Sequence, residues 1–148
     1  MRWLVPPVLA LILALAMAAA SRLLPWPAML PELWSAVLGW LLIGLGLGLM
    51  VAAAWLFRRR RTNIHPFGKP DVLITEGVFR FSRNPIYLGL TLILIGIAVQ
   101  LNALATLPMV IVFFLVADRW YIPIEERLAE SAFGEAYDAY RRLVRRWL

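Results

Sequence analysis

The stretch LWSAVLGWLLIGLGLGLMVAAAWLF, which occupies residues 33–57, contains no charged side chain. A helix of about 20 apolar residues is long enough to cross the hydrocarbon core of a bilayer, and it satisfies its own backbone hydrogen bonds there. The whole chain has the same character, with 62% hydrophobic and 16% charged residues in 148. A soluble domain carries about 25% charged residues, so this composition excludes an ordinary soluble domain and a disordered chain. The sequence therefore predicts an all-α membrane protein.

Three further apolar runs lie around this stretch, over residues 3–20, 86–101 and 103–117. The last two are short for a full span, so they extend into flanking residues, tilt little or form a hairpin partly covered by protein. The first run also fits the pattern of a cleaved signal peptide, although we favour a retained helix. We predict one membrane domain of about four transmembrane helices, with a C-terminal amphipathic cytoplasmic helix. The predicted segments are helices over 3–20, 33–57, 86–101 and 103–121, a cytoplasmic loop over 58–85 and the final helix over 123–148.

Lysine and arginine are concentrated after the second and fourth predicted helices. Residues 58–83 hold seven of them and the tail after Ala117 holds six, whereas the loop between the first two helices holds only Arg22. Basic residues near helix ends mark the cytoplasmic side of a membrane protein. Both segments and both termini are therefore predicted to face the cytoplasm, in an inner or cytoplasmic membrane. The formal net charge of +6 is then a topology signal, and we predict no nucleic-acid partner.

The residue inventory excludes several kinds of chemistry. The chain has no Cys and one His, which excludes disulfides, thiolate ligands and a multi-His metal site within the chain, so no metal is predicted. The serines lie in no nucleophile-elbow pattern, and no phosphate-binding loop is present, so hydrolase and nucleotidase functions have no support. The one histidine, His65, is isolated before Pro66, and its role stays open.

Polar and small residues inside the predicted helices argue against transport. The first three helices contain no acidic residue, whereas a proton-coupled transporter needs ionisable groups within the membrane. Asp118 lies at a helix end beside Arg119, where pairing or capping explains it better than proton transfer. Gly44 and Gly48 form a small-xxx-small face, which is mostly a signal of helix packing. That face allows a dimer without requiring one, so the oligomeric state stays open.

The stretch RNPIYLG at 83–89 combines residue types that suit a charged ligand. Arg83 offers five hydrogen-bond donors to a carboxylate or phosphate, Tyr87 offers an aromatic face to a cation, and Gly89 permits a close approach. The alternative is a set of ordinary features at a membrane boundary. In that interpretation Arg83 snorkels, Asn84 caps the third helix, Pro85 begins it and Tyr87 lies at the interface.

Two adjacent carboxylates, Glu125 and Glu126, precede an amphipathic pattern that includes Tyr137 and Tyr140. The carboxylates are either a solvated helix start or the holders of a cationic or hydroxyl-rich ligand. Neighbours on a helix project about 100° apart, so both need not serve one site. The pattern that follows is typical of a helix at the membrane interface, with a lid over a pocket as the alternative. Gly134 is expected to bend or divide this helix.

Four ordered motifs resemble one family. They are LITEGVFR at 73–80, RNPIYLG at 83–89, EERL at 125–128 and FGEAYDAY at 133–140. In these motifs the chain resembles the isoprenylcysteine carboxyl methyltransferase and phospholipid methyltransferase superfamily, over about residues 60–147. The resemblance implies an integral membrane enzyme that uses S-adenosylmethionine, held at the ends of the last two membrane helices and the C-terminal helix. It also implies a lipid-like acceptor that reaches the cofactor from the bilayer.

The resemblance assigns roles to particular residues. The residues expected to bind the cofactor are Arg83, Asn84, Pro85, Tyr87, Gly89, Glu125, Glu126, Tyr137 and Tyr140. Among them Arg83 and Glu126, with Arg141, are the predicted catalytic residues, and Arg141 and the two tyrosines close the pocket or touch the acceptor. Asn84 and Asp71 stand where the isoprenylcysteine enzymes carry histidine, which argues against a prenylcysteine acceptor.

We therefore predict an S-adenosylmethionine-dependent methyltransferase that acts on a small lipophilic acceptor, a carboxylate, an amine or a thiol, at the cytoplasmic face. A carboxylate acceptor needs no general base, whereas an ammonium acceptor must first lose a proton. The candidate bases are Glu126, Asp71 and His65. The alternative function is a non-enzymatic four-helix membrane scaffold or interaction protein, which would have no affinity for the cofactor.

Overall fold

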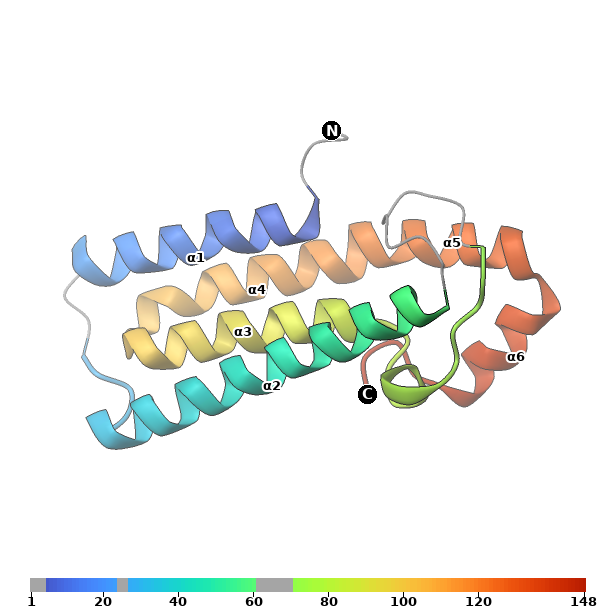
Figure 1. Ribbon diagram of the computed structural model, residues 1–148. Coiled ribbons are helices and arrows are strands. Elements are labelled where there is room, and N and C mark those ends of the chain that lie inside the picture. The colour runs from blue at the N-terminus through green and yellow to red at the C-terminus, as the bar shows by residue number, and fades with distance from the viewer. Residues whose placement is uncertain (1–4, 24–26, 61–70) are drawn as a thin grey trace.

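The computed structural model describes residues 5–23, 27–60 and 71–148. Within these ranges the chain folds into helices that run side by side, and no strand is formed (Figure 1). The long helices are α1 (Pro6–Leu23), α2 (Glu32–Arg59), α3 (Pro85–Leu101) and α4 (Leu107–Val116). They are followed by α5 (Ile122–Phe133) and α6 (Glu135–Leu143), and a short 3-10 turn, Gly77–Arg80, precedes α3.

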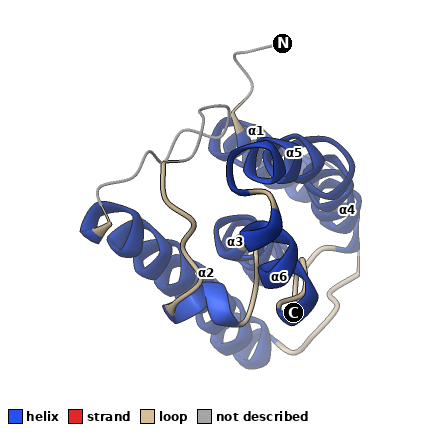
Figure 2. Cartoon of the chain, turned by 90° about the vertical axis from the view of Figure 1, so that its right-hand side faces the viewer, coloured by secondary structure: helices blue, strands red, loops and turns tan. Residues whose placement is uncertain are grey.

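The length and composition of these helices make the chain an all-α membrane protein, as predicted. In the described residues three helical stretches are long and apolar enough to cross a bilayer, Pro6–Leu23, Glu32–Arg59 and Leu104–Phe133. The fourth apolar helix, α3, has 17 residues, which is at the lower end of the length of a spanning helix. Because α3 lies between the other three helices (Figure 2), much of its surface is covered by protein rather than lipid.

Close glycine contacts hold α2 against α3. A Cβ atom built on Gly46 would lie 2.5 Å from the carbonyl oxygen of Gly89, and one built on Gly89 would lie 2.7 Å from that of Gly46. About two turns further along each helix, Gly39 and Gly96 make the same reciprocal approach, at 3.0 and 2.8 Å. Small residues let helix backbones come this close, and dispersion contacts then stabilise the pair in a lipid environment. We call these four residues the glycine seam.

The predicted packing role of Gly44 and Gly48 is wrong within this chain. A Cβ atom built on either residue meets no described atom within 4 Å. Gly46, between them in sequence, points to the opposite side of α2 and packs on α3. The spacing of the glycines identified a glycine-rich helix. The pair that it singled out, Gly44 and Gly48, lies on the face of α2 where a Cβ atom meets open space.

The end of the bundle opposite the C-terminus is closed by one side chain. Asn102 adopts a left-handed backbone conformation (φ 49°) at the end of α3. Its side-chain oxygen accepts hydrogen bonds from the backbone N–H groups of Met29 and Leu30, and its amide donates to the Leu30 carbonyl at 2.7 Å. Asparagine tolerates this conformation better than most residues. The loop before α2 is thereby tied to the turn between α3 and α4.

The final predicted helix, over 123–148, is two helices in the structure. Gly134 adopts φ 50° and separates α5 from α6, because glycine has no Cβ to disfavour that conformation. Helix α6 ends at Leu143, and residues 144–148 are not helical. The fourth predicted helix does not stop at residue 121 but continues into α5 through a π-helical turn, Ala117–Tyr121.

Candidate active site

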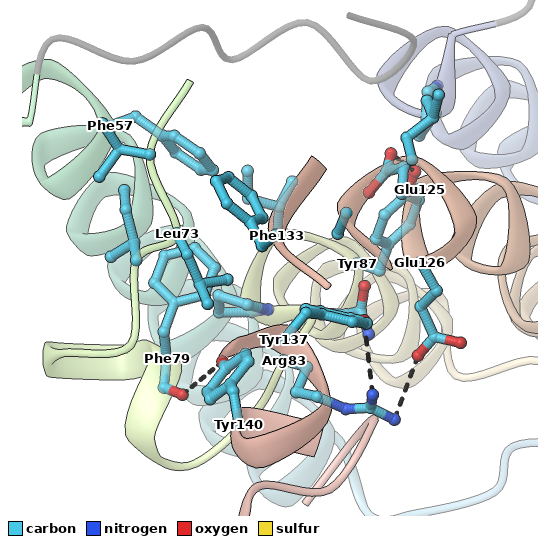
Figure 3. A pocket seen from close by; sticks show the side chains of 18 of the residues that line it. Phe57, Leu73, Phe79, Arg83, Tyr87, Glu125, Glu126, Phe133, Tyr137 and Tyr140 are labelled. Atoms are coloured by element: carbon cyan, nitrogen blue, oxygen red, sulfur yellow. Dashed lines mark hydrogen bonds and ion pairs between the residues drawn. The ribbon is translucent and has the colours of Figure 1, made fainter. Parts of the chain in front are cut away.

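A cavity of about 260 Å³ lies at the end of the bundle where α2 ends and α3 begins. This volume is close to the lower end of the range of about 300–1,000 Å³ that is typical of small-molecule pockets. Figure 3 shows that polar side chains lie on one side of the cavity and aromatic and aliphatic ones on the other. The polar lining residues are Arg83, Asn84, Tyr87, Glu125, Glu126, Tyr137 and Tyr140.

Arg83 occupies the loop between the 3-10 turn and α3. Pro85 begins α3, because its fixed φ and missing N–H suit the first helical position. The Arg83 side chain is only 9% exposed and forms an ion pair with Glu126 at 3.1 Å. Its Nη1 atom donates to the Tyr137 hydroxyl at 3.4 Å. Among the described residues no atom accepts a hydrogen bond from its buried Nε–H, so this donor of Arg83 is left unsatisfied within the protein.

The two adjacent carboxylates have different surroundings. Glu125 accepts a hydrogen bond of 2.5 Å from the Tyr87 hydroxyl, and the structure gives it no cationic partner among the described residues. Glu126 lies between two arginines, Arg83 at 3.1 Å and Arg146 at 2.6 Å. The charge of Glu126 is therefore balanced by protein, whereas that of Glu125 is left for a cationic ligand.

A π-helical turn sets the direction of these side chains. The turn ends at Tyr121, two residues before Pro123. Proline has no N–H to donate, and in a regular α-helix its ring clashes with the carbonyl four residues earlier. Such single π turns are frequent at functional sites, because they rotate the residues that follow. Here the rings of Tyr121 and Tyr87 stack at a centroid distance of 6.2 Å, beside the hydrogen bond to Glu125.

Helix α6 supplies the wall of the cavity at its outer end. The break at Gly134 turns the chain so that α6 lies beyond the start of α3 (Figures 1 and 2). Tyr137 and Tyr140 are its two buried residues, and the Tyr140 hydroxyl donates to the Phe79 carbonyl at 2.7 Å. Burial raises the pKa of both hydroxyls, so both remain protonated at neutral pH.

The opposite wall of the cavity is apolar. The rings of Phe57, at the end of α2, and Phe79, in the 3-10 turn, meet edge to face at 5.5 Å. Apolar surface of this kind binds hydrocarbon through burial rather than through directed contacts. The principal apolar lining residues are Phe57, Val72, Leu73, Ile74, Phe79, Ile86, Leu128 and Phe133.

The structure brings most of the predicted site residues together at this cavity. Gly89 and Arg141 are the exceptions, since neither is among the described lining residues. Gly89 faces α2 in the glycine seam, and Arg141 pairs with Asp138 at the surface, where its side chain is 45% exposed. The predicted lining residues that meet at the cavity are Arg83, Asn84, Pro85, Tyr87, Glu125, Glu126, Tyr137 and Tyr140.

The other predicted roles have mixed outcomes. Asn84 stands at the start of α3, but its side chain makes no capping bond there and donates instead to the Arg146 carbonyl at 3.1 Å. Asp118 pairs with Arg119 at 3.3 Å, as predicted. Asp71 is exposed and is not among the described lining residues. His65 lies outside the described residues.

Sequence reasoning missed two parts of the site. The apolar wall includes Phe57, which is indistinguishable by pattern from other interfacial aromatic residues, and Phe133, which begins the fourth motif but was assigned no role. Arg146 also went unrecognised, because in the basic tail RRLVRRWL at 141–148 it has the same signal as its exposed neighbours. The one available clue was the aromatic residue beside it, Trp147, in an otherwise charged segment.

Comparisons with known proteins agree with this architecture. A family described as phospholipid methyltransferase matches residues 34–136. An uncharacterized protein of Haemophilus influenzae is 48% identical over 63 residues, which cover 42% of this chain and 98% of that relative. No solved structure matches the chain.

The fold and the cavity thus define an all-α membrane protein with a mixed polar and apolar site at one end of its bundle. The family match extends from α2 through the start of α6 and includes both carboxylates and Arg83. The chain belongs to the phospholipid methyltransferase family, which lies within the superfamily that the motifs resemble.

Proposed function

We propose that this protein transfers a methyl group from S-adenosylmethionine to a small lipophilic acceptor at the cytoplasmic face of the membrane. Membership of a methyltransferase family supports the reaction class. The single observation that carries the proposal is the cavity itself, in which a carboxylate without a cationic partner among the described residues and an arginine face an aromatic and aliphatic wall. The polar side of the cavity suits the charged cofactor, and the apolar side suits the hydrocarbon part of the acceptor.

The residues at the polar end suit this cofactor. A sulfonium is stabilised by aromatic faces and by nearby negative charge, which Tyr87 and Glu125 supply. The amino-acid part of the cofactor carries a carboxylate, for which the guanidinium of Arg83, a residue that lines the cavity, is a charged donor. We assign Arg83, Glu125 and Tyr137 to the binding of the cofactor, with Glu126 holding Arg83 in place.

S-adenosylmethionine supplies an electrophilic methyl group when it is bound. The contribution of the protein is to align the acceptor with that group and to exclude water, rather than to form a covalent bond of its own. The rings of Phe57, Phe79 and Phe133 hold the lipophilic part of the acceptor. Tyr137 and Tyr140, on α6, cover the polar end from the aqueous side.

The acceptor is a carboxylate, an amine or a thiol, and the need for a base distinguishes them. An ammonium acceptor must release a proton before it can attack. Both oxygens of Glu126 are bound by arginine, so we assign proton acceptance to Glu125, which forms no ion pair with any described residue. This assignment replaces Glu126 as the preferred base.

The distribution of charge supports a cytoplasmic location for the site. Arg58, Arg59 and Arg60 lie at the end of α2 beside the cavity, whereas Arg22 lies at the opposite end of the bundle (Figure 1). Basic residues favour the cytoplasmic side. We infer that the cavity opens to the cytoplasm, where S-adenosylmethionine is made and used.

The experiment that tests this function is a transfer assay with methyl-labelled S-adenosylmethionine. Purified protein in lipid vesicles is incubated with lipids sorted by headgroup and with simple lipophilic acids, amines and thiols. We expect label in one acceptor class, and loss of transfer in Glu125→Gln with the variant still folded. If the folded wild-type protein labels no acceptor and binds no cofactor, the scaffold alternative replaces this proposal.

A further inference from the structure

The five residues after α6 return toward the bundle. Val144 has extended backbone angles (φ −121°, ψ 131°), and the chain ends beside the loop that precedes α3 (Figure 1). We call residues 144–148 the C-terminal strap. None of its residues is among those that line the cavity, yet it contacts both the loop that carries Arg83 and the helix that carries Glu126.

Backbone carbonyls of the strap hold the Arg83 loop at three points. The N–H of Arg83 donates to the Arg145 carbonyl at 3.0 Å. The Arg146 carbonyl accepts from the Ser82 hydroxyl at 3.3 Å and from the Asn84 amide at 3.1 Å. Ser82 and Asn84 are buried, so these bonds satisfy polar groups that water does not reach. The strap therefore fixes the backbone on both sides of Arg83.

Side chains of the strap fix the other half of the site. Arg146 binds both carboxylate oxygens of Glu126, at 3.2 and 2.6 Å. It also reaches the carboxylate of Asp118 at 3.2 Å. The indole N–H of Trp147 donates to that carboxylate at 2.9 Å, and its ring stacks on Phe114 at 4.7 Å. The strap is thus anchored to α4 by an aromatic contact and to the π turn by Asp118.

These contacts form a line of alternating charges, from Arg83 through Glu126 and Arg146 to Asp118. Only Arg83 and Glu126 line the cavity. We propose that Arg146 is a positioning residue, which holds Glu126 in a bidentate grip and through Glu126 fixes the guanidinium of Arg83 at the cavity wall. This inference rests on the proposed function, because it names Arg83 as a contact of the cofactor.

The geometry requires arginine at this position. A planar guanidinium offers several donors in a fixed arrangement, so it can bind two oxygens of Glu126 and one of Asp118 together, whereas lysine offers a single point charge. Without Arg146, Glu126 keeps only Arg83 as a cationic partner, and that pair is free to rotate as a unit. Arg83 would then lose its fixed direction rather than its charge.

Two neighbouring arginines provide a matched test. Arg145 is exposed and contributes its backbone carbonyl, whereas Arg146 contributes its side chain. Binding of S-adenosylmethionine to the full-length protein in detergent is measured by calorimetry for wild type, Arg145→Ala, Arg146→Ala and Arg146→Lys. We expect a loss of about tenfold in affinity for Arg146→Ala, a smaller loss for Arg146→Lys, and wild-type affinity for Arg145→Ala. Equal affinity in Arg146→Ala and wild type overturns the proposal.

A double-mutant cycle separates positioning from a general loss of stability. If Arg146 acts through Glu126, then Arg146→Ala causes no further loss in a Glu126→Gln background. Independent, additive losses in the two variants contradict that mechanism. Should Arg146→Ala fail to fold, the pair Arg146→Lys and Arg145→Lys carries the same test.

Hydrogen exchange provides a readout that does not depend on the cofactor. The amide of Arg83 is bonded to the strap, so we expect faster exchange in residues 82–87 for Arg146→Ala than for Arg145→Ala. If wild type binds no cofactor, the proposed function fails, while exchange still reports whether Arg146 orders the loop. Unchanged exchange in a folded Arg146→Ala contradicts the positioning role by itself.

Discussion

The glycine seam lies between α2 and α3, whereas the cavity also draws on α5, α6 and the Arg83 loop, and the two regions are built in opposite ways. Along the seam, Gly46 and Gly89 bring the backbones of α2 and α3 together with no side chain between them. Nearer the start of α3, Tyr87 donates to Glu125 and Arg83 donates to Tyr137, so polar side chains rather than close backbone packing line this region. The seam stabilises the fold through close packing, and the cavity keeps unpaired donors and acceptors for a ligand. Substitutions in the two regions should therefore separate stability from binding.

The largest expected effect is on stability, from a change in the seam. Gly46→Ala places a methyl group 2.5 Å from a backbone oxygen, which no side-chain rotation can relieve, so we expect a loss of about 1–3 kcal/mol in the free energy of unfolding. The matched control is Gly44→Ala, whose methyl group meets open space. It should leave stability unchanged or raise it by up to about 1 kcal/mol. Unfolding of both variants in detergent is the measurement, and equal stabilities would contradict the seam.

The next effect is on binding, from a change at the polar end of the cavity. Glu125→Gln removes the charge that no described cation balances, so affinity for S-adenosylmethionine should fall by at least about tenfold, as expected for a lost charged hydrogen bond. The melting temperature should fall little, because the amide oxygen can still accept from Tyr87. A large loss of stability without a loss of affinity would show that Glu125 stabilises the fold and does not bind the cofactor.

Two tyrosines of α6 offer a smaller, paired comparison. Tyr140→Phe removes the hydrogen bond to the buried Phe79 carbonyl, which should cost about 1 kcal/mol of stability. Tyr137→Phe removes only the 3.4 Å contact with Arg83, so it should weaken cofactor binding more than stability. Thermal unfolding and calorimetry on both variants check the two halves of this prediction. The reverse pattern would exchange the roles of the two hydroxyls.

The smallest effect is expected at the surface pair of Arg60 and Glu76. Their side chains are 51% and 42% exposed, with 2.8 Å between Nε and Oε1, so salt and water screen the attraction. The hydrogen bond from Arg60 lowers the pKa of Glu76. The small contribution of this ion pair to stability is therefore present at neutral pH, and it is lost as the pH falls through the lowered pKa of Glu76. Glu76→Gln should unfold slightly more easily than wild type at neutral pH and low salt, and unfolding of the two should match at high salt.

The sequence correctly predicted the structural features that depend on composition or on local backbone chemistry. Long uncharged runs predict membrane helices because the bilayer imposes their length, and Pro85 and Gly134 predict helix boundaries through their backbone preferences. The motifs around Arg83, Glu125 and Tyr137 identified residues that meet at one cavity, although Arg83 and Tyr137 are 54 positions apart in the chain.

Features that depend on which side of a helix faces a neighbour were not predictable from the pattern. Gly46 and Gly44 have the same composition signal, and only the packing of α3 distinguishes them. The different surroundings of Glu125 and Glu126 follow from a π turn that no local rule announces. Arg146 becomes special only when the strap returns to Glu126, a contact between residues 20 positions apart.

The most direct test of the central claim is calorimetric titration of S-adenosylmethionine into the wild-type protein, Glu125→Gln and Gly44→Ala. All three should be folded by circular dichroism, in detergent and in lipid. We predict micromolar binding by wild type and by Gly44→Ala, and binding at least about tenfold weaker by Glu125→Gln. Folded wild-type protein that binds no cofactor in either medium, or equal binding by all three, would contradict the assignment of the cavity.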